Sequence, residues 1–299
     1  MTELHHQAKV HNTPGTRTRI GAYVALTKPR IIELLLITTL PSMVLAAGGW
    51  PGTWLVVATL IGGTLSAGGA NALNMYYDRD IDELMRRTRA RPLARHEVAP
   101  GNALAFGIIL GVAGFAWLWV FTTLLAALIA SAALLFYVFV YTMTLKRSSV
   151  QNIVIGGAAG AAPALVGWAA VTGTVGVPAW ALFFIVFYWT PPHFWALALR
   201  YQDDYAAAGV PMLPVVAGVE ATTRRMLLYT GLMVGVSLLL VPLGSMSWIY
   251  LVAALVLGAW FLWDTWRVVR RPEQAMRLFT TSTVYLSVLF AAVMLDVLL

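Results

Sequence analysis

Three polar side chains recur at every fourth position of one stretch of the chain, namely Asn74, Asp78 and Asp82. They close a long apolar run, so a continuous helix would carry them as a stripe on one face, drifting by about 80° over about 12 Å. Two carboxylates and an amide oxygen aimed at one space are hard oxygen ligands of the kind that Mg²⁺ prefers, alongside water and phosphate. The alternative is an ordinary acidic helix end at a membrane surface. Charged groups that enter a membrane helix are costly, which favours the metal site.

The segment directly after this stripe is rich in arginine. Guanidinium groups bind phosphate oxygens two at a time, and this segment holds Arg86, Arg87, Arg89, Arg91 and Arg95. Among these we assign Arg87 and Arg91 to a diphosphate. The alternative is that the loop is basic only because cytoplasmic loops of membrane proteins usually are. Acidic and basic groups in adjacent segments favour a metal ion together with a phosphate group.

A second acidic pair, Asp203 and Asp204, follows a later apolar run that ends in Arg200. If the two runs face each other across a central cavity, the two acidic sets can hold a pair of Mg²⁺ ions on one diphosphate. Such ions would neutralise the charge that develops as the diphosphate leaves. Adjacent residues of a helix point in different directions, so only one of the pair faces inward, and we favour Asp204.

The elements that must position these residues are membrane helices. Of the 299 residues, 60% are apolar and 11% are charged, against about 25% charged in an ordinary soluble domain. Nine apolar runs approach the length of about 20 residues that a membrane span needs. They lie at roughly 24–48, 52–77, 102–120, 122–143, 150–173, 178–199, 226–243, 246–266 and 279–298. The sequence therefore predicts an all-α polytopic membrane protein, with nine transmembrane helices around a central cavity open to the cytoplasmic side.

All 20 lysine and arginine residues fall on one side when nine spans alternate across a membrane. The positive-inside rule then places the N terminus and the active-site loops in the cytoplasm. We expect the membrane to be the inner membrane of a bacterial cell. Residues 1–20 are polar and lack the apolar core of a signal peptide, so we expect a disordered cytosolic tail followed by one transmembrane domain over 21–299.

The net charge of +7 does not indicate nucleic acid, because the charges lie between apolar runs rather than on a soluble basic face. The chain also contains no cysteine. A thiol nucleophile and a thiolate metal site are therefore excluded, and any catalysis must depend on oxygen and nitrogen groups.

These features together resemble the UbiA superfamily of intramembrane prenyltransferases, whose mark is Asn-x-x-x-Asp-x-x-x-Asp on the second of nine helices. Asn74, Asp78 and Asp82 match that motif. From Leu26 onward the chain is similar to the branch of the superfamily that farnesylates heme. The stretches that carry this similarity are NALNMYYDRDID with RTRARPL, KRSSVQNIVIGGAAGA, and PPHFWALALRYQDDYAAAGVPMLPVV.

The resemblance implies farnesyl diphosphate as the donor, heme b as the acceptor and Mg²⁺ as the cofactor. The farnesyl group would join a heme vinyl group, water would add, and the product, heme O, would pass to a heme A synthase. The catalytic and metal-binding residues implied are Asn74, Asp78, Asp82 and Asp204, with Asp203 as a further metal ligand. The implied diphosphate contacts are Arg87, Arg91, Lys146, Arg147 and Arg200.

The chain departs from the superfamily pattern at two positions. Many members carry Asp-x-x-x-Asp on the sixth helix, whereas Arg200 stands four residues before Asp204 here. Either Asp203 substitutes, or Arg200 contacts a phosphate or a heme propionate directly. Lys146 resembles a phosphate-binding lysine of the superfamily, but it follows Tyr141 at a spacing one residue longer than usual.

His193 lies within a predicted span, directly after Pro191 and Pro192, which leave backbone carbonyls nearby without helical partners. With heme as the acceptor, this histidine would be an axial ligand or would orient the porphyrin. The alternative is a histidine that only hydrogen-bonds the freed carbonyls. Both interpretations stay open.

Two other functions compete with heme farnesylation. One is a UbiA-type transferase with a different aromatic acceptor, a hydroxybenzoate or a chlorophyllide, and the heme-like stretches argue against it. The other is an ion-coupled transporter, in which intramembrane acids bind ions near the bilayer midplane. The acids here gather at one surface, as expected for a substrate with a water-soluble head and a lipid tail.

Overall fold

The computed structural model describes residues 17–299, apart from the side chains at positions 31 and 33–35. Within this range the chain is helical and forms no strand, which confirms the predicted all-α class. The elements in chain order are α1 (Arg19–Leu26), α2 (Pro29–Ala47), α3 (Thr53–Leu84), α4 (Pro100–Phe121), α5 (Leu124–Leu135), the π-helix η1 (Phe136–Leu145), α6 (Lys146–Ser148), α7 (Asn152–Thr172), α8 (Val177–Arg200), α9 (Gln202–Ala207), α10 (Leu213–Leu243), α11 (Trp248–Arg270), the 3₁₀ helix η2 (Pro272–Gln274) and α12 (Ala275–Leu298).

Most of the predicted N-terminal tail, residues 1–16, lies outside the described part of the chain. The tail was expected to continue to residue 20, but Arg19 and Ile20 already belong to α1. The hydroxyl of Thr18 accepts a hydrogen bond from the Gly21 amide at 3.1 Å and so caps this short helix. The first described helix therefore includes the last two residues of the predicted tail.

Eight helical segments of the described chain are long and apolar enough to cross a membrane. They are Thr53–Leu84, Pro100–Phe121, Leu124–Ser148, Asn152–Thr172, Val177–Arg200, Leu213–Leu243, Trp248–Arg270 and Pro272–Leu298. α2 adds a shorter apolar stretch, Leu36–Ala47, that corresponds to the first predicted span. The protein is thus an integral membrane protein, and the count of nine spans, which requires α2 to cross, stays a prediction.

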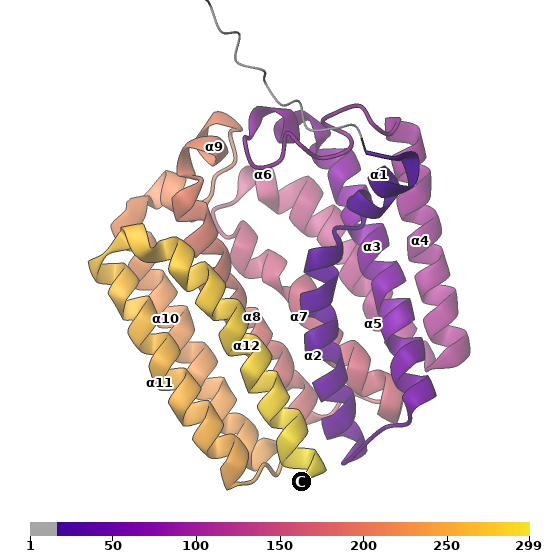
Figure 1. Cartoon of the computed structure of the whole chain (residues 1–299), viewed down its shortest axis with the longest axis vertical. Helices are drawn as coiled ribbons and strands as arrows, with labels where there is room; N and C mark the ends of the chain where they lie inside the picture. The colour runs from indigo at the N-terminus through magenta and orange to yellow at the C-terminus, as the bar shows by residue number, and fades with distance from the viewer. Residues whose placement is uncertain (1–16) are drawn as a thin grey trace, which may run out of the picture.

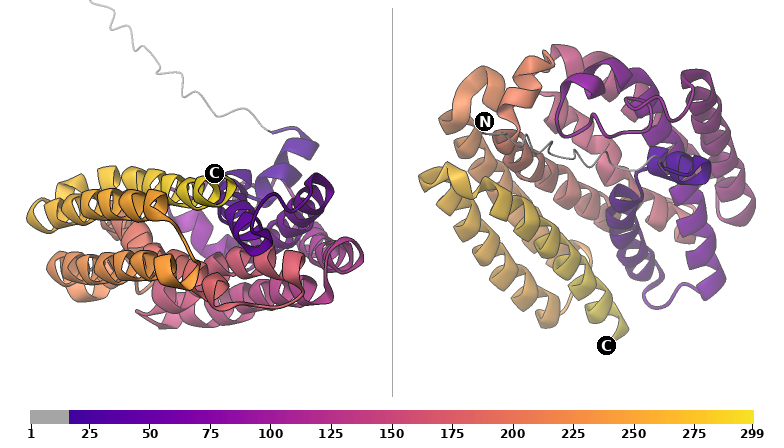
Figure 2. Two further views of the ribbon diagram at one scale, coloured as in Figure 1. Left: turned by 90° about the horizontal axis from the view of Figure 1, so that it is seen from below. Right: turned by 45° about the horizontal axis from the view of Figure 1, so that its top comes forward.

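The helices lie side by side, with α10, α11 and α12 on one side of the molecule and α2, α3, α4 and α5 on the other (Figure 1). α7 and α8 join the two groups, because α7 packs against α2 and α5 while α8 packs against α10 and α12. The view from below shows the same two groups (Figure 2). α1, α6 and α9 lie at the end of the molecule opposite the C terminus (Figure 1). The basic and acidic clusters singled out in the sequence therefore gather at one end.

Close packing of α3 against α4 depends on glycine. A Cβ added at Gly69 would lie 2.8 Å from both the Gly107 carbonyl oxygen and the Gly111 amide nitrogen. Both atoms belong to the α4 backbone, so a side chain at Gly69 would force the helices apart. Gly69 is thus required for this close approach, whereas a Cβ added at Gly63 would meet nothing within 4 Å.

Two helices differ from the predicted spans in ways that affect the site. α3 continues without interruption to Leu84, well past the predicted end at residue 77, so the whole polar stripe belongs to one helix. α10 begins at Leu213 rather than near residue 226, and it bends at Gly218, where φ is 77°. This left-handed conformation is easily adopted only by glycine, which explains the bend at this position.

Candidate active site

The polar stripe of α3 lies inside the protein. Asn74, Asp78 and Asp82 are 2%, 0% and 1% exposed, respectively. Asn74 Nδ2 donates hydrogen bonds to Asp78 Oδ2 at 2.8 Å and to Thr142 Oγ1 at 3.0 Å. The every-fourth spacing places the three side chains on one buried face, as the sequence predicts, and it brings the π-helix η1 into contact with them.

Two of the cations assigned to a diphosphate contact this stripe. Lys146 Nζ donates to Asp78 Oδ2, and Arg91 Nη1 donates to both carboxylate oxygens of Asp82 at 2.7 Å. Burying a carboxylate is costly unless a cation accompanies it. The two ion pairs offset that cost and hold positive charge against the stripe.

A third cation, Lys28, also contacts the stripe and is missing from the residues that the sequence assigns to the site. Its Nζ donates to Asn74 Oδ1 at 2.7 Å. The Lys28 backbone is left-handed, with φ at 53°, a conformation that costs a non-glycine residue about 1–3 kcal/mol. This strained turn before Pro29 directs the side chain to the stripe. A lysine at the beginning of an apolar run was the available signal, because an unpaired cation there is costly.

The longer Tyr141 to Lys146 spacing has a structural counterpart. Residues 136–145 form a π-helix, in which the hydrogen bonds run from residue i to residue i+5. The Lys146 amide accordingly donates to the Tyr141 carbonyl. The wider turn absorbs one residue more than an α-helix would, and Lys146 contacts Asp78 despite the longer spacing.

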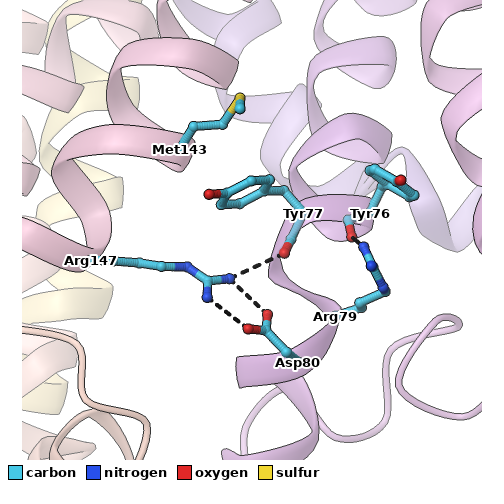
Figure 3. A pocket seen from close by; sticks show the side chains of 6 residues that line it. All are labelled: Tyr76, Tyr77, Arg79, Asp80, Met143 and Arg147. Atoms are coloured by element: carbon cyan, nitrogen blue, oxygen red, sulfur yellow. Dashed lines mark hydrogen bonds and ion pairs between the residues drawn. The ribbon is translucent and has the colours of Figure 1, made fainter.

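Arg147 contacts Tyr77 and Asp80 of α3 (Figure 3). It donates to both carboxylate oxygens of Asp80 at 2.7 Å and to the Tyr77 carbonyl at 3.1 Å. Its guanidinium is 3.8 Å from Asp78 Oδ1. The pocket beside it has a volume of about 510 Å³ and is lined by Tyr76, Tyr77, Arg79, Asp80, Met143 and Arg147.

The second acidic pair is arranged differently. Asp203 is exposed and Asp204 is buried. Arg86 Nε donates to Asp204 Oδ1 at 2.7 Å, and the Arg87 amide donates to Asp204 Oδ2 at 3.3 Å. Burial alone would raise the pKa of the Asp204 carboxyl, but these hydrogen bonds lower the pKa below its ordinary value. Asp204 thus holds the loop that follows α3.

The remaining predicted cations, Arg87 and Arg200, line a separate pocket of about 290 Å³ with Arg86 and Tyr201. None of the three stripe residues lines this pocket. The structure therefore divides the predicted diphosphate contacts into two sets. Arg91, Lys146 and Arg147 lie at the stripe, and Arg87 and Arg200 lie at the end of α8.

The stripe fits a magnesium ion in its chemistry. Asp78 Oδ1 is buried and has no hydrogen-bond partner, and the neighbouring carboxylate and amide oxygens are hard ligands. The described residues contain no group of three or more histidine, cysteine or acidic side chains placed to share a metal. Asp203 and Asp204 therefore do not join Asp78 and Asp82 in one centre, and water and phosphate would have to complete the coordination shell.

His193 lies between α8 and α12. Its ring stacks between Trp189 and Phe279, with centroids 4.2 and 4.3 Å away, and its Nδ1 is 2.7 Å from Ser282 Oγ. Ser282 Oγ is also 2.8 Å from the Phe279 carbonyl oxygen, and when the hydroxyl donates its hydrogen there it accepts from Nδ1–H of the histidine. In this tautomer Nε2 carries the lone pair.

Curated relatives match nearly the whole chain. The protoheme IX farnesyltransferase of Parafrankia sp. strain EAN1pec is 55% identical over 279 residues, which cover 92% of this chain and 89% of that protein. The protoheme IX farnesyltransferase of Clavibacter michiganensis is 53% identical over 292 residues, covering 96% and 95% of the two chains.

Solved structures share the fold at low sequence identity. A structure of digeranylgeranylglyceryl phosphate synthase aligns with a TM-score of 0.77 at 17% identity, covering 93% of this chain and 98% of that one. A UbiA homolog from Archaeoglobus fulgidus, bound to DMAPP and Mg²⁺, aligns with a TM-score of 0.66 at 17% identity over 91% and 99%. The sequence profile of the UbiA prenyltransferase family matches residues 35–294. This protein therefore belongs to the UbiA prenyltransferase family.

Proposed function

We propose that this prenyltransferase transfers the farnesyl group of farnesyl diphosphate to a vinyl group of heme b, with addition of water, and releases heme O and diphosphate. The buried stripe of Asn74, Asp78 and Asp82, with cations against it, is the observation that carries the donor half of this proposal. The acceptor half is supported by relatives above 50% identity that are named protoheme IX farnesyltransferase. These relatives favour heme over a hydroxybenzoate or a chlorophyllide.

The donor binds at the stripe in this proposal. Mg²⁺ held by Asn74, Asp78 and Asp82 would neutralise the diphosphate charge. Lys146, Arg91 and Arg147 also bind the diphosphate and stabilise it as it leaves with the electron pair of the broken C–O bond. A second ion on Asp203 and Asp204 would require Asp204 to exchange Arg86 for the metal.

The acceptor then captures the allylic cation. The π electrons of a heme vinyl group form the new C–C bond, and positive charge develops on the vinyl carbon next to the porphyrin. Water adds to that carbon and loses a proton, which gives a hydroxyl group. The apolar helices around the site delay water until the C–C bond has formed.

His193 is the proposed heme contact. Its Nε2 carries the lone pair that an iron ligand requires, because Nδ1–H is engaged by Ser282 Oγ at 2.7 Å. Engagement of the second ring nitrogen is typical of metal-ligating histidines, since it holds the ring in one tautomer and one orientation.

The proposed setting is the inner membrane of a bacterial cell, with the charged end of the bundle in the cytoplasm. The one-sided distribution of lysine and arginine supports this orientation. Heme O would then pass to a heme A synthase for oxidation.

The reaction is tested with purified full-length protein in detergent, supplied with heme b, farnesyl diphosphate and Mg²⁺. Mass spectrometry should detect heme enlarged by a farnesyl group and one water. Parallel reactions contain a hydroxybenzoate or a chlorophyllide in place of heme. Prenylation of one of these acceptors without any enlarged heme would contradict the proposal, and so would ion transport by proteoliposomes that form no prenylated product.

A further inference from the structure

The pocket at the end of α8 is built from two separate parts of the chain. Arg86 and Arg87 come from the loop after α3, whereas Arg200 is the last residue of α8 and Tyr201 follows it. Three guanidinium groups thus line a pocket of about 290 Å³ that opens to the surface. Like charges brought together in this way require anionic partners.

Within the described residues, only one of these arginines pairs with an anionic group. Arg86 pairs with Asp204 at 2.7 Å, and exposed Asp203 lies near the same guanidinium. The Arg87 side chain instead contacts Tyr205, with Nη2 3.3 Å from the hydroxyl oxygen. Within the described part of the chain, the Arg200 guanidinium has neither a hydrogen-bond partner nor an ion-pair partner. Two guanidinium groups of the pocket therefore lack a carboxylate.

The chemistry of these two groups selects a ligand with two separate anionic groups. A guanidinium binds a planar carboxylate through two parallel hydrogen bonds. Because Arg87 and Arg200 belong to different elements, each can engage its own carboxylate. Heme b, the acceptor of the proposed function, carries two propionates on one edge of the porphyrin and its vinyl groups on the remote edge.

We propose that this arginine pocket binds the two propionates of heme b through Arg87 and Arg200. The inference rests on the proposed function. Anchoring the propionates at the charged end of the bundle directs the vinyl edge of heme toward the interior of the protein, where a vinyl group must meet the allylic cation. His193 lies seven residues before Arg200 on the same helix, a rise of about 10 Å.

The diphosphate of the donor has related anionic chemistry and is the competing ligand. It already has cations of its own, because Lys28, Lys146 and Arg91 all contact the stripe. The arginine pocket contains none of the stripe residues and hence none of the oxygen ligands that a metal and diphosphate pair would share. These observations favour carboxylates at the end of α8.

The test compares heme b with its dimethyl ester, in which the propionates carry no charge. Binding of each is measured by absorption titration of the purified full chain and of Arg87→Gln, Arg200→Gln and the double variant. Each single substitution should weaken heme b binding about tenfold, the loss expected for a charge-assisted hydrogen bond. Binding of the ester and the KM for farnesyl diphosphate should not change.

Arg89→Gln is the matched control, because Arg89 is exposed in the same loop and does not line the pocket. It should bind both hemes as the unmodified protein does. Thermal unfolding of every variant separates a lost contact from a lost fold.

Three results would overturn the pocket assignment. The first is an unmodified protein that binds the ester as tightly as heme b, and the second is a variant that loses affinity for both equally. The third is a raised KM for farnesyl diphosphate with heme binding intact, which would assign the pocket to the donor. By contrast, the expected loss of heme b binding without any farnesylated product from the unmodified protein would support the pocket and contradict the proposed reaction.

Discussion

The end of α3 and the end of α8 both combine acidic residues with arginine, yet the structure leaves opposite charges available at the two places. On α3 the acids are buried and Asp78 Oδ1 has no hydrogen-bond partner. On α8 and α9 the buried acid, Asp204, is occupied by Arg86, and the Arg200 guanidinium is without a partner in the described chain. The first region is suited to bind a metal cation, which in turn binds a polyanion. The second region is suited to bind an anion without a metal.

The difference arises from helix continuity. α3 runs unbroken through Leu84, so residues four apart stay on one face. α8 ends at Arg200, and Tyr201 has φ and ψ of −113° and 30° before α9 begins. Arg200 and Asp204 therefore do not share a helical face, although they are also four residues apart. A spacing of four residues therefore aligns the polar side chains on α3. At the end of α8 the same spacing leaves Arg200 and Asp204 on different faces.

Neutralising Asp78, the stripe carboxylate with an unpartnered oxygen, should have the largest effect. Asp78→Asn keeps the size of the side chain but removes a carboxylate that faces Lys146, and we expect farnesyl transfer to fall about a thousandfold. Turnover of heme b is the measurement, with thermal unfolding as a check of the fold. Glu83→Gln is the control on the same helix, because Glu83 is exposed and lies off the stripe. Equal losses in the two variants would abolish the distinction between stripe and surface.

Lys28 tests whether the third cation belongs to the donor side. Lys28→Gln removes a charged hydrogen bond to Asn74, which we expect to lower kcat/KM for farnesyl diphosphate by about thirtyfold, equivalent to about 2 kcal/mol. Heme affinity should stay the same. Arg30→Gln, two residues along the chain and exposed, should match the unmodified protein. A loss of heme affinity in Lys28→Gln would place this lysine on the acceptor side.

Asp204→Asn addresses the second region and should act less strongly. It weakens the hydrogen bond from Arg86 and loosens the loop that carries Arg87, so we expect turnover to fall about fivefold, equivalent to about 1 kcal/mol. The Mg²⁺ concentration for half-maximal rate should be unchanged, whereas Asp82→Asn should raise it. A raised Mg²⁺ requirement in Asp204→Asn would restore the second metal site that the sequence predicts.

Local register made the stripe predictable from sequence. Asn74, Asp78 and Asp82 depend only on helical periodicity, and the breaks at Phe121 to Leu124 and at Leu243 to Trp248 follow from short interruptions in apolar runs. Long apolar segments likewise predicted the all-α membrane fold. Each of these features is encoded within a few residues of where it appears.

The features that escaped prediction depend on distant or strained contacts. Lys28 reaches Asn74 from a left-handed conformation that is disfavoured before proline. Asp204 finds Arg86 across 118 positions of sequence. The π-helix that carries Lys146 to Asp78 leaves no local pattern distinguishable from an α-helix. Local periodicity does not predict these contacts, because they depend on tertiary packing.

His193 offers the finest test of the acceptor side, with the smallest expected effect on turnover. The vinyl chemistry does not use the iron, so His193→Ala should lower the rate only a few fold, yet it should alter the heme absorption spectrum if Nε2 ligates the iron. Ser282→Ala is the matched variant, because it removes the partner of Nδ1 and keeps the ring. Its spectrum should shift less, since a second partner orients the ligand without replacing it. An unchanged spectrum and unchanged heme affinity in His193→Ala would leave this ring as packing between Trp189 and Phe279, with Arg87 and Arg200 as the acceptor contacts.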